Sequence, residues 1–256
     1  MAAITYAEEG DVGVITLSNG DLNFFTSGAF HELEECVAQI EGSDVRAAVW
    51  RAEGDVFSAG VDVQIFKDAA EAGEGFPSLV GPVQRLEALP IPTLAICHGL
   101  CLTAGLEVAL GCDMIWAGES AKFGLVEKVV GLTPGAGGTQ RMAERAGPAR
   151  AREFVMTGRL YDAATLERWN VVNRVLPDAE VSEKGMAFAR DLAAGPTVAH
   201  SKTKQIVRAY LDGGIDHADE VTPGVFAGLF ETEDLKNAVE SFLREGPGKF
   251  SDFKGR

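Results

Sequence analysis

The sequence predicts an α/β fold in which a mixed core is followed by a wholly helical C-terminal part. Two observations lead to this prediction. Short apolar runs rich in β-branched residues, which are typical of buried strands, recur through the first half of the chain, at residues 12–17, 47–51, 93–98 and 113–117. From about Thr197 onward, the apolar residues recur at helical spacing throughout.

Each of the first three predicted strands is followed by a loop and then by a helical pattern, which indicates repeated strand–turn–helix units. The first of these helices spans residues 27–40, with Ser27 as its predicted N-cap. Its apolar side chains lie near one helical face, at Phe30, Leu33, Cys36, Val37 and Ile40. The later segment 64–76 is rich in Ala, Glu and Gly and fits either a mobile lid over a pocket or a solvated surface helix.

The helical C-terminal part divides at its glycines and its proline. Helices are predicted at 198–211, 217–230 and 234–244, with interruptions at Gly213, Gly214 and Pro223. We therefore expect two regions, an α/β core over residues 1–196 and a helical region over residues 197–256.

The composition is that of an ordinary globular protein with one large core. Of 256 residues, 46% are hydrophobic and 24% are charged. The most apolar segment, 91–112, is interrupted by His98, Glu107 and several glycines, so it predicts a buried core segment rather than a bilayer span. The first residues lack the basic start and apolar run of a secretory signal, and we expect a cytoplasmic protein with no membrane partner.

The cysteines and the net charge exclude further classes of protein. Three of the four cysteines lie within the apolar segment and none has metal-pair spacing, so we expect reduced core thiols and no metal site. The net charge of −15 opposes binding to nucleic acid. The same negative field opposes an anionic ligand, whose phosphates would need local lysines, arginines or backbone N–H groups.

One carboxylate stands inside an apolar helix. Residues 98–110 predict a strand end and a glycine turn that lead into this helix, which contains Glu107. A buried carboxylate is costly unless it is paired, hydrogen-bonded or protonated. Glu107 is therefore either a structural group tied to backbone N–H groups at the helix start or a functional acid. The free N–H groups from Thr103 to Gly105, together with the helix dipole, could also stabilise a developing oxyanion.

Two further stretches could complete such a site. The turn at 56–62 could present the N–H group of Val61 to a pocket, although Gly60 there could merely supply an unusual backbone angle. Glu127 precedes a glycine-rich loop, and on its own it could equally be an exposed acid beside Lys128. No phosphate-binding glycine fingerprint follows a predicted strand, which argues against a nucleotide-binding fold.

Together these stretches resemble the enoyl-CoA hydratase/isomerase (crotonase) family, and the resemblance covers nearly the whole chain. Residues 56–62 are similar to the family element F-x-A-G-x-D, and residues 98–110 to N-G-x-x-x-G-G-G-x-E-L. Residues 122–141 are similar to A-K-F-x-x-P-E followed by P-G-A-G-G-T-Q-R, and residues 154–173 to the later M-x-T-G-R element. The resemblance implies an α/β, crotonase-like spiral of β-β-α units with a C-terminal α-helical trimerisation region.

The resemblance also implies roles for individual residues. Glu107 and Glu127 would be the catalytic carboxylates. The N–H groups of Val61 and Ala104 would form the oxyanion hole. The residues implied for substrate binding or orientation are Ser58, Ala59, Gly60, Lys67 and Gly135. Of these, Lys67 as a phosphate partner has the alternative of an ordinary solvated surface lysine.

These roles imply an enoyl-CoA hydratase, a lyase that adds water syn to a trans-2-enoyl-CoA and gives a 3-hydroxyacyl-CoA. No metal or nucleotide cofactor is implied, because coenzyme A arrives as part of the acyl-CoA substrate. The expected assembly is a homotrimer or a dimer of trimers. Enoyl-CoA isomerisation, another crotonase-type acyl-CoA reaction and a non-catalytic acyl-CoA-binding protein remain alternatives.

The chain departs from the family elements at several positions. His98 stands for the usual Asn, Thr103 and Ala104 for two glycines, and Val126 for Pro. Oxyanion donors are backbone groups, so Ala104 is compatible with the hole where its conformation is allowed. The departures imply a changed pocket shape and substrate choice, whereas the retention of both glutamates is typical of hydratase-like members.

Overall fold

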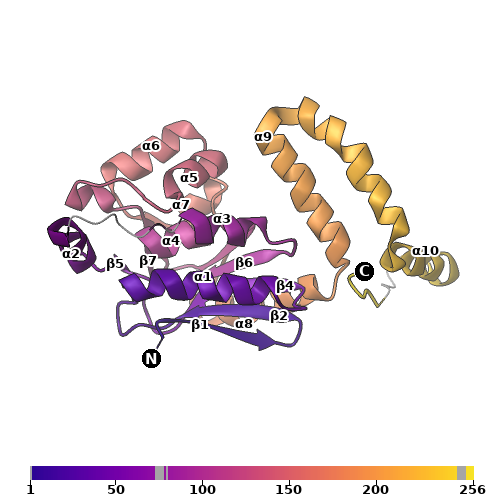
Figure 1. Ribbon diagram of the computed structural model, residues 1–256, viewed down its shortest axis with the longest axis horizontal. Helices are drawn as coiled ribbons and strands as arrows, with labels where there is room; N and C mark the ends of the chain where they lie inside the picture. Colours follow the sequence, from indigo (N-terminus) through magenta and orange to yellow (C-terminus); the bar gives the residue numbers. More distant parts are fainter. Residues whose placement is uncertain (1, 73–77, 79, 247–251) are drawn as a thin grey trace.

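A computed structural model describes residues 2–72, 78, 80–246 and 252–256 of the chain (Figure 1). The strands of its main sheet are β1 (Ile4–Glu9), β2 (Val12–Leu17), β4 (Ala47–Ala52), β6 (Thr93–Cys97), β8 (Met114–Gly118) and β11 (Arg174–Leu176). They lie in the order β1-β2-β4-β6-β8-β11. β1 runs antiparallel to β2, and the later neighbours are all parallel.

Shorter strands form two smaller sheets beside the main one. They are β3 (Phe24–Phe25), β5 (Gly60–Val61), β7 (Leu100–Leu102), β9 (Lys122–Gly124) and β10 (Tyr161–Asp162). β3 pairs with β5, and the other sheet has the order β10-β9-β7. An isolated bridge between Ser58 and Cys101 joins the turn before β5 to β7. The segments around residues 60 and 100 are therefore neighbours in space.

The helices follow the strands in a regular order. The α-helices of the core are α1 (Ser27–Glu41), α2 (Gln64–Ala72), α3 (Val80–Ala88), α4 (Thr103–Leu110), α5 (Gly138–Ala146), α6 (Pro148–Thr157), α7 (Ala163–Arg168) and α8 (Asp178–Ala193). The remaining helices are α9 (Thr197–Ala227), α10 (Glu233–Glu245) and the 3-10 helices η1 (Glu127–Val130) and η2 (Gly228–Glu231). The series β2-β3-α1, β4-β5-α2 and β6-β7-α4 confirms the predicted spiral of β-β-α units.

The main sheet separates two hydrophobic clusters. The larger cluster lies between the sheet and α1, α3 and α4, and it includes Leu33, Val83 and Leu106. On the opposite face, Met186 of α8 packs in a second cluster with Val49 of β4. Because both faces are covered, every residue of β2 and β6 is buried, as is typical of parallel sheets. The predicted strands 12–17 and 47–51 match β2 and β4 within one residue.

The predicted N-cap of α1 was wrong by one residue. Thr26 is the N-cap, and its hydroxyl oxygen accepts a hydrogen bond from the N–H group of Ala29. Thr26 has the extended backbone that this position requires, whereas Ser27 is already helical. β1 was not predicted from the sequence, because its residues do not form an apolar run.

Two other predictions concern the segment 64–76 and the cysteines. The segment 64–76 begins as α2, and residues 73–76 lie outside the described residues. All four cysteines are unpaired and buried, which confirms the predicted core thiols. Within the described ranges, no helix combines the length and the apolarity that crossing a membrane requires.

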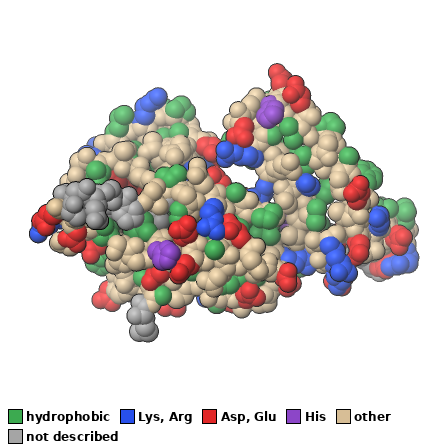
Figure 2. Space-filling model, in the orientation of Figure 1, with side chains coloured by type: hydrophobic (Ala, Val, Ile, Leu, Met, Phe, Trp, Pro, Cys, Tyr) green, Lys and Arg blue, Asp and Glu red, His purple; other side chains and the backbone are tan. Residues whose placement is uncertain are grey.

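The helices α9, η2 and α10 form a C-terminal arm that projects from the core (Figure 1). Figure 2 shows a notch between the arm and the core. α9 turns back on itself at Gly214, which has φ 77° and ψ −170°, so the predicted interruption at Gly213 and Gly214 is confirmed. The interruption predicted at Pro223 was wrong, because Pro223 lies inside the second half of α9. The predicted boundary after residue 196 falls at the start of α9.

Two basic side chains attach the first half of α9 to the core. The ammonium group of Lys204 lies 2.8 Å from a carboxylate oxygen of Asp113 and 3.0 Å from the carbonyl oxygen of Ile91. The guanidinium group of Arg46 donates a 2.8 Å hydrogen bond to the hydroxyl oxygen of Thr197. These partly buried contacts fix the base of the arm near the N-terminal ends of β4, β6 and β8.

Candidate active site

Glu107 is a buried carboxylate in the middle of α4. All eight residues of α4 are buried, and Glu107 itself is only 4% exposed. Its Oε1 atom accepts hydrogen bonds from the N–H groups of Ala136 and Gly138, at 2.8 and 2.9 Å. Burial raises the pKa of Glu107 above its ordinary value, and the two backbone bonds oppose that rise. The carboxylate is therefore held at one oxygen by the loop before α5, and not by the start of its own helix.

Glu127 begins η1 and is the second carboxylate of the site. Both of its oxygens are buried and have no hydrogen-bond partner among the described residues. Burial raises the pKa of Glu127 to about 7, and the negative charge of the nearby Glu107 contributes to the rise. The alternative of an exposed acid beside Lys128 does not hold, because the carboxylate points into the protein. The two glutamates are thus close enough to influence each other's protonation.

The two predicted oxyanion donors also come together. Val61 follows Gly60 in β5, and Ala104 is the second residue of α4, where an N–H group has no partner within the helix. The contact between these elements is tight: a Cβ atom added to Gly60 would lie 2.2 Å from the hydroxyl oxygen of Thr103. Gly60 has φ 106°, so glycine is needed there for its conformation as well as for space. β5 and the start of α4 are therefore in close contact.

The predicted substrate-binding residues differ in what they contact. The hydroxyl oxygen of Ser58 accepts a 3.0 Å hydrogen bond from the N–H group of Gly60, and Ser58 is fully buried. Ser58 therefore shapes the turn before β5, and its hydroxyl oxygen already accepts one hydrogen bond. The N–H group of Ala59 donates a 2.9 Å hydrogen bond to the carbonyl oxygen of Leu22. Gly135 is exposed beside Ala136, whose N–H group contacts Glu107.

Lys67 is an exposed residue of α2. Its ammonium group lies 3.9 Å from a carboxylate oxygen of Glu71, one helical turn away. Exposed pairs of this kind contribute little to stability, so Lys67 is free to exchange this partner for another anion. Its role as a phosphate partner stays a prediction.

His98 shows the structural reason for one departure from the family elements. Its Nε2 atom lies 2.9 Å from the carbonyl oxygen of Gly54, and its ring packs edge-on against Phe57 with 5.8 Å between the ring centroids. Burial lowers the pKa of His98. The imidazole therefore links the loop after β4 to the turn between β6 and β7. These segments lead to β5 and α4, which contain the two predicted oxyanion donors.

Sequence reasoning missed two residues that hold Glu107 and a third whose charge acts on it. Ala136 and Gly138 supply its backbone donors, and the only signal was the glycine-rich run from 135 to 138. Arg141 is buried, and its guanidinium group lies 2.7 Å from a carboxylate oxygen of Glu87 in α3. The positive charge of Arg141 also opposes the rise in the pKa of Glu107. The Arg141–Glu87 ion pair thus ties the start of α5 to α3.

Gly138→Ala is expected to lower activity by displacing Glu107. An added Cβ would lie 2.8 Å from Cγ and 3.0 Å from Oε1 of Glu107. Because the surroundings are closely packed, we expect a loss of about 1–3 kcal/mol in stability and roughly 100-fold in kcat. Thermal unfolding and steady-state kinetics measure both effects. Gly81→Ala is the matched control, because an added Cβ at Gly81 meets no atom within 4 Å. Equal activity of the two variants would contradict the prediction.

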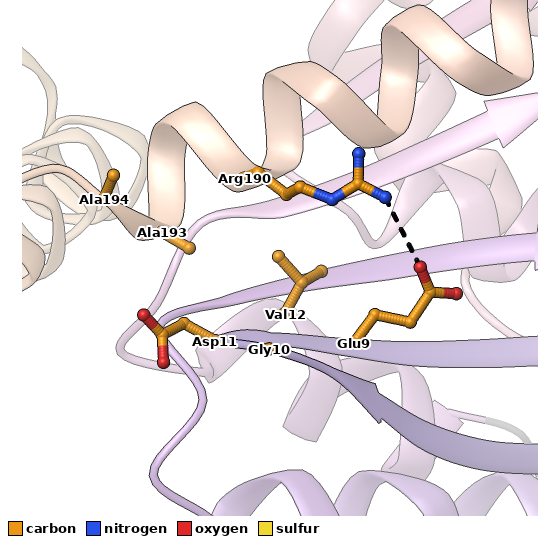
Figure 3. Close-up of a pocket in the computed structure, with 7 residues that line it drawn as sticks. All are labelled: Glu9, Gly10, Asp11, Val12, Arg190, Ala193 and Ala194. Atoms are coloured by element: carbon orange, nitrogen blue, oxygen red, sulfur yellow. Dashed lines mark ion pairs between the residues drawn. The ribbon is translucent and has the colours of Figure 1, made fainter.

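A separate surface cavity of about 450 Å³ lies between the β1–β2 turn and the end of α8 (Figure 3). Its charged lining residues are Glu9, Asp11 and Arg190, and a guanidinium nitrogen of Arg190 lies 3.6 Å from a carboxylate oxygen of Glu9. None of the predicted site residues lines this cavity. It is therefore distinct from the site formed by the two buried glutamates.

Comparisons with known proteins agree on one family. The sequence profile of the enoyl-CoA hydratase/isomerase family matches residues 7–254. The chain is 32% identical over 254 residues to the short-chain-enoyl-CoA hydratase of Clostridium acetobutylicum, covering 97% of each chain. It is 31% identical over 258 residues to the probable enoyl-CoA hydratase of Bacillus subtilis, covering 98% of this chain and 99% of the relative. The crystal structure of an enoyl-CoA hydratase from Bacillus anthracis matches with a TM-score of 0.88 at 25% identity, covering 99% of this chain and 100% of that one.

Proposed function

Because the chain belongs to the enoyl-CoA hydratase/isomerase family, we propose that it is an enoyl-CoA hydratase, which adds water to a trans-2-enoyl-CoA to give a 3-hydroxyacyl-CoA. One observation carries this proposal: two glutamates with buried carboxylate oxygens influence each other but differ in their hydrogen bonding. Hydration needs one group that accepts a proton and one that donates a proton. An isomerase needs chiefly one carboxylate, so the pair favours hydration.

The thioester carbonyl group would bind at the N–H groups of Val61 and Ala104. When water attacks C3 of the enoyl group, negative charge moves to the thioester oxygen. Backbone donors that are already fixed in place stabilise this charge, and one such donor contributes about 3 kcal/mol to the transition state. The contact between Gly60 and Thr103 supports this role, because it holds the two donor segments against each other.

The unequal surroundings of the two glutamates suggest their division of labour. Glu107, with one oxygen held by two backbone N–H groups, would take a proton from water as the hydroxyl oxygen bonds to C3. Glu127, whose pKa is raised to about 7, would be protonated and deliver its proton to C2. One proton is gained and one is lost at the carboxylates, and exchange with solvent restores both. Groups with separated pKa values are typical of acid–base pairs.

The pH dependence of kcat/KM is expected to be bell-shaped. Activity falls as the pH rises through about 7, because Glu127 then loses the proton that it must donate. Activity also falls at low pH as Glu107 is protonated, at a pKa above the ordinary 4.5 of glutamate. Because the two glutamates interact, the two apparent pKa values of this profile belong to the pair rather than to single residues. Initial rates between pH 4.5 and 9 measure the profile, and a rate that still rises at pH 9 would contradict the assignment of Glu127.

No metal or nucleotide cofactor enters this proposal, because coenzyme A would arrive with the substrate. Lys67 remains our candidate phosphate partner, since it is exposed on α2, the helix that follows β5 and Val61. Lys67→Ala is expected to raise KM without lowering kcat, because a contact to a remote phosphate is the same in the ground state and the transition state.

The C-terminal arm would mediate self-association. Large hydrophobic side chains are exposed along it, and Figure 2 shows such side chains over this part of the molecule. Phe226, Phe230, Phe242 and Leu243 are each more than half exposed. Exposed apolar groups of this size commonly mark interaction surfaces. We expect light scattering to give three or six times the chain mass of 27.1 kDa, and a mass of one chain would contradict the proposal.

The first test is the loss of ultraviolet absorbance of the conjugated thioester when the protein meets crotonyl-CoA or a long-chain trans-2-enoyl-CoA. A relative named short-chain-enoyl-CoA hydratase makes crotonyl-CoA the first choice. Loss of absorbance that depends on both glutamates is the expected result. Thioester binding without any loss of absorbance would favour another acyl-CoA reaction of this family or a binding protein without turnover.

A further inference from the structure

Thr103, the first residue of α4, has a backbone conformation that β-branched residues rarely adopt. Its φ is +43°, in the left-handed region that favours glycine. The family element that this segment resembles has glycine at the corresponding position, and glycine would adopt this angle without strain. Strained residues of this kind concentrate at sites of function, where the surrounding structure holds them in place. The strained backbone therefore marks Thr103 as a candidate functional residue.

The hydroxyl group of Thr103 is buried without a partner. Thr103 is 8% exposed, and its Oγ1 atom has no hydrogen-bond partner among the described residues. Buried hydroxyl groups in folded proteins are nearly always hydrogen-bonded, because an unpaired one keeps the cost of losing water. The unused hydroxyl proton therefore suits an acceptor that the protein chain itself does not supply.

The position of this hydroxyl group indicates which acceptor it suits. Oγ1 lies against the backbone of Gly60, where an added Cβ would be only 2.2 Å away. Gly60 directly precedes Val61, and Thr103 directly precedes Ala104. The hydroxyl group thus lies where the two segments with the proposed oxyanion donors touch. An acyl oxygen bound by those donors would be the nearest external acceptor.

We propose that the hydroxyl group of Thr103 donates a third hydrogen bond to the thioester oxygen of the bound acyl-CoA. This inference rests on the proposed binding of a thioester at Val61 and Ala104. The bond strengthens as the oxygen gains negative charge, because hydrogen bonds to an ionised acceptor are stronger than those to a neutral one. Thr103 then contributes more to the transition state than to substrate binding, and its effect lies in kcat.

Three variants of Thr103 distinguish the contribution of its hydroxyl group from the contribution of its side-chain shape. Thr103→Val keeps the branched shape and the backbone strain but removes the hydroxyl group. Thr103→Ser keeps the hydroxyl group and removes the methyl group. Thr103→Gly removes the hydroxyl group together with the strain, so it is expected to fold even where the valine variant does not. Circular dichroism and thermal unfolding check each fold.

The valine and glycine variants are expected to lose roughly 10- to 100-fold in kcat for crotonyl-CoA hydration. Their KM should change little, and the serine variant should stay within about 3-fold of the wild type in kcat. Wild-type kcat in Thr103→Gly, or an equal loss in the serine and glycine variants, would overturn the proposal.

A binding measurement distinguishes failure of this inference from failure of the hydratase proposal. The absorbance of 4-dimethylaminocinnamoyl-CoA shifts to longer wavelength when donors polarise its carbonyl group. We expect this shift in the wild type and in Thr103→Ser, and a smaller shift in the valine and glycine variants. If the wild type binds the probe but hydrates no enoyl-CoA, only the hydratase proposal fails, and the same comparison still decides the role of Thr103. Equal shifts in all four proteins overturn the role of Thr103, and no binding by the wild type overturns both proposals.

Discussion

Glu127→Gln is expected to lower kcat for enoyl-CoA hydration by about 10²- to 10⁴-fold, the range that a positioned general acid contributes. Glutamine has nearly the shape of glutamic acid but has no carboxylic proton to transfer to C2. The oxyanion donors remain in place, so KM should change much less than kcat. Steady-state kinetics with crotonyl-CoA measure both constants. Glu183→Gln, at an exposed residue of α8, is the control and should behave as the wild type.

The same substitution is expected to stabilise the protein at alkaline pH. The pKa of Glu127 is about 7 in the folded protein and 4.5 in the ordinary case. Between these values the folded state binds more protons than the unfolded state, so the stability of the wild type falls as the pH rises through this interval. Glutamine avoids this loss. The variant should therefore gain stability relative to the wild type between pH 4 and pH 8, by at most about 3 kcal/mol.

Urea unfolding of the wild type and Glu127→Gln at pH 4, 6 and 8 measures this gain. A difference in the free energy of unfolding that does not change with pH would show that Glu127 is not a buried acid with a raised pKa. An active Glu127→Gln variant would instead contradict its role as the proton donor. The two outcomes are separate, so stability and mechanism are tested independently in one variant.

Glu107→Gln is expected to lower kcat by a similar factor, about 10²- to 10⁴-fold, for a different reason. Its amide oxygen can still accept the hydrogen bonds from Ala136 and Gly138, so the loop before α5 should keep its position. The amide cannot, however, take a proton from water. The free energy of unfolding at pH 7 is expected to change by less than about 1.5 kcal/mol, the typical net value of one hydrogen bond.

Glu107→Gln should also lower the pKa of Glu127, because the negative charge of Glu107 helps to raise it. Carbon-13 NMR titration of the glutamate carboxyl groups can follow this shift in the wild type and in the variant. Full activity of Glu107→Gln would exclude the scheme with two carboxylates. An unchanged pKa of Glu127 would show that the two side chains do not interact.

The sequence predicts the architecture well because the architecture depends on local patterns. Apolar β-branched runs locate β2, β4, β6 and β8 of the main sheet but not β11, and Gly213 and Gly214 locate the turn of α9. Glu107 could be chosen as a site candidate because a lone carboxylate inside an apolar helix needs a compensating partner. Each of these inferences uses residues that are neighbours in the sequence or lie on one helical face.

What the sequence could not predict depends on contacts between distant segments. The partners of Glu107 are about 30 positions away in the sequence. They are backbone N–H groups, which nearly every residue type has, so the residue types at these positions do not reveal them. The unpaired hydroxyl group of Thr103 became evident only when β5 and α4 were in contact. Pro223 indicated an interruption, yet the helix continues through it. The donors to Glu107 and the unpaired hydroxyl group of Thr103 depend on how distant segments meet in the fold, so they escaped prediction.

The main sheet divides the core into two clusters, and this division determines where substitutions can alter stability without altering the proposed site. The side chains at the proposed site belong to segments that pack with the larger cluster, whereas α8 and the opposite face of the sheet form a separate packing unit. Distant sites contribute almost additively to stability. Residues of α8 such as Val181 and Met186 can therefore be repacked to adjust thermal stability while the geometry around Glu107 and Glu127 stays as it is. Substitutions on one face of the main sheet can therefore change the stability of the protein, while the residues of the proposed site lie with the other face.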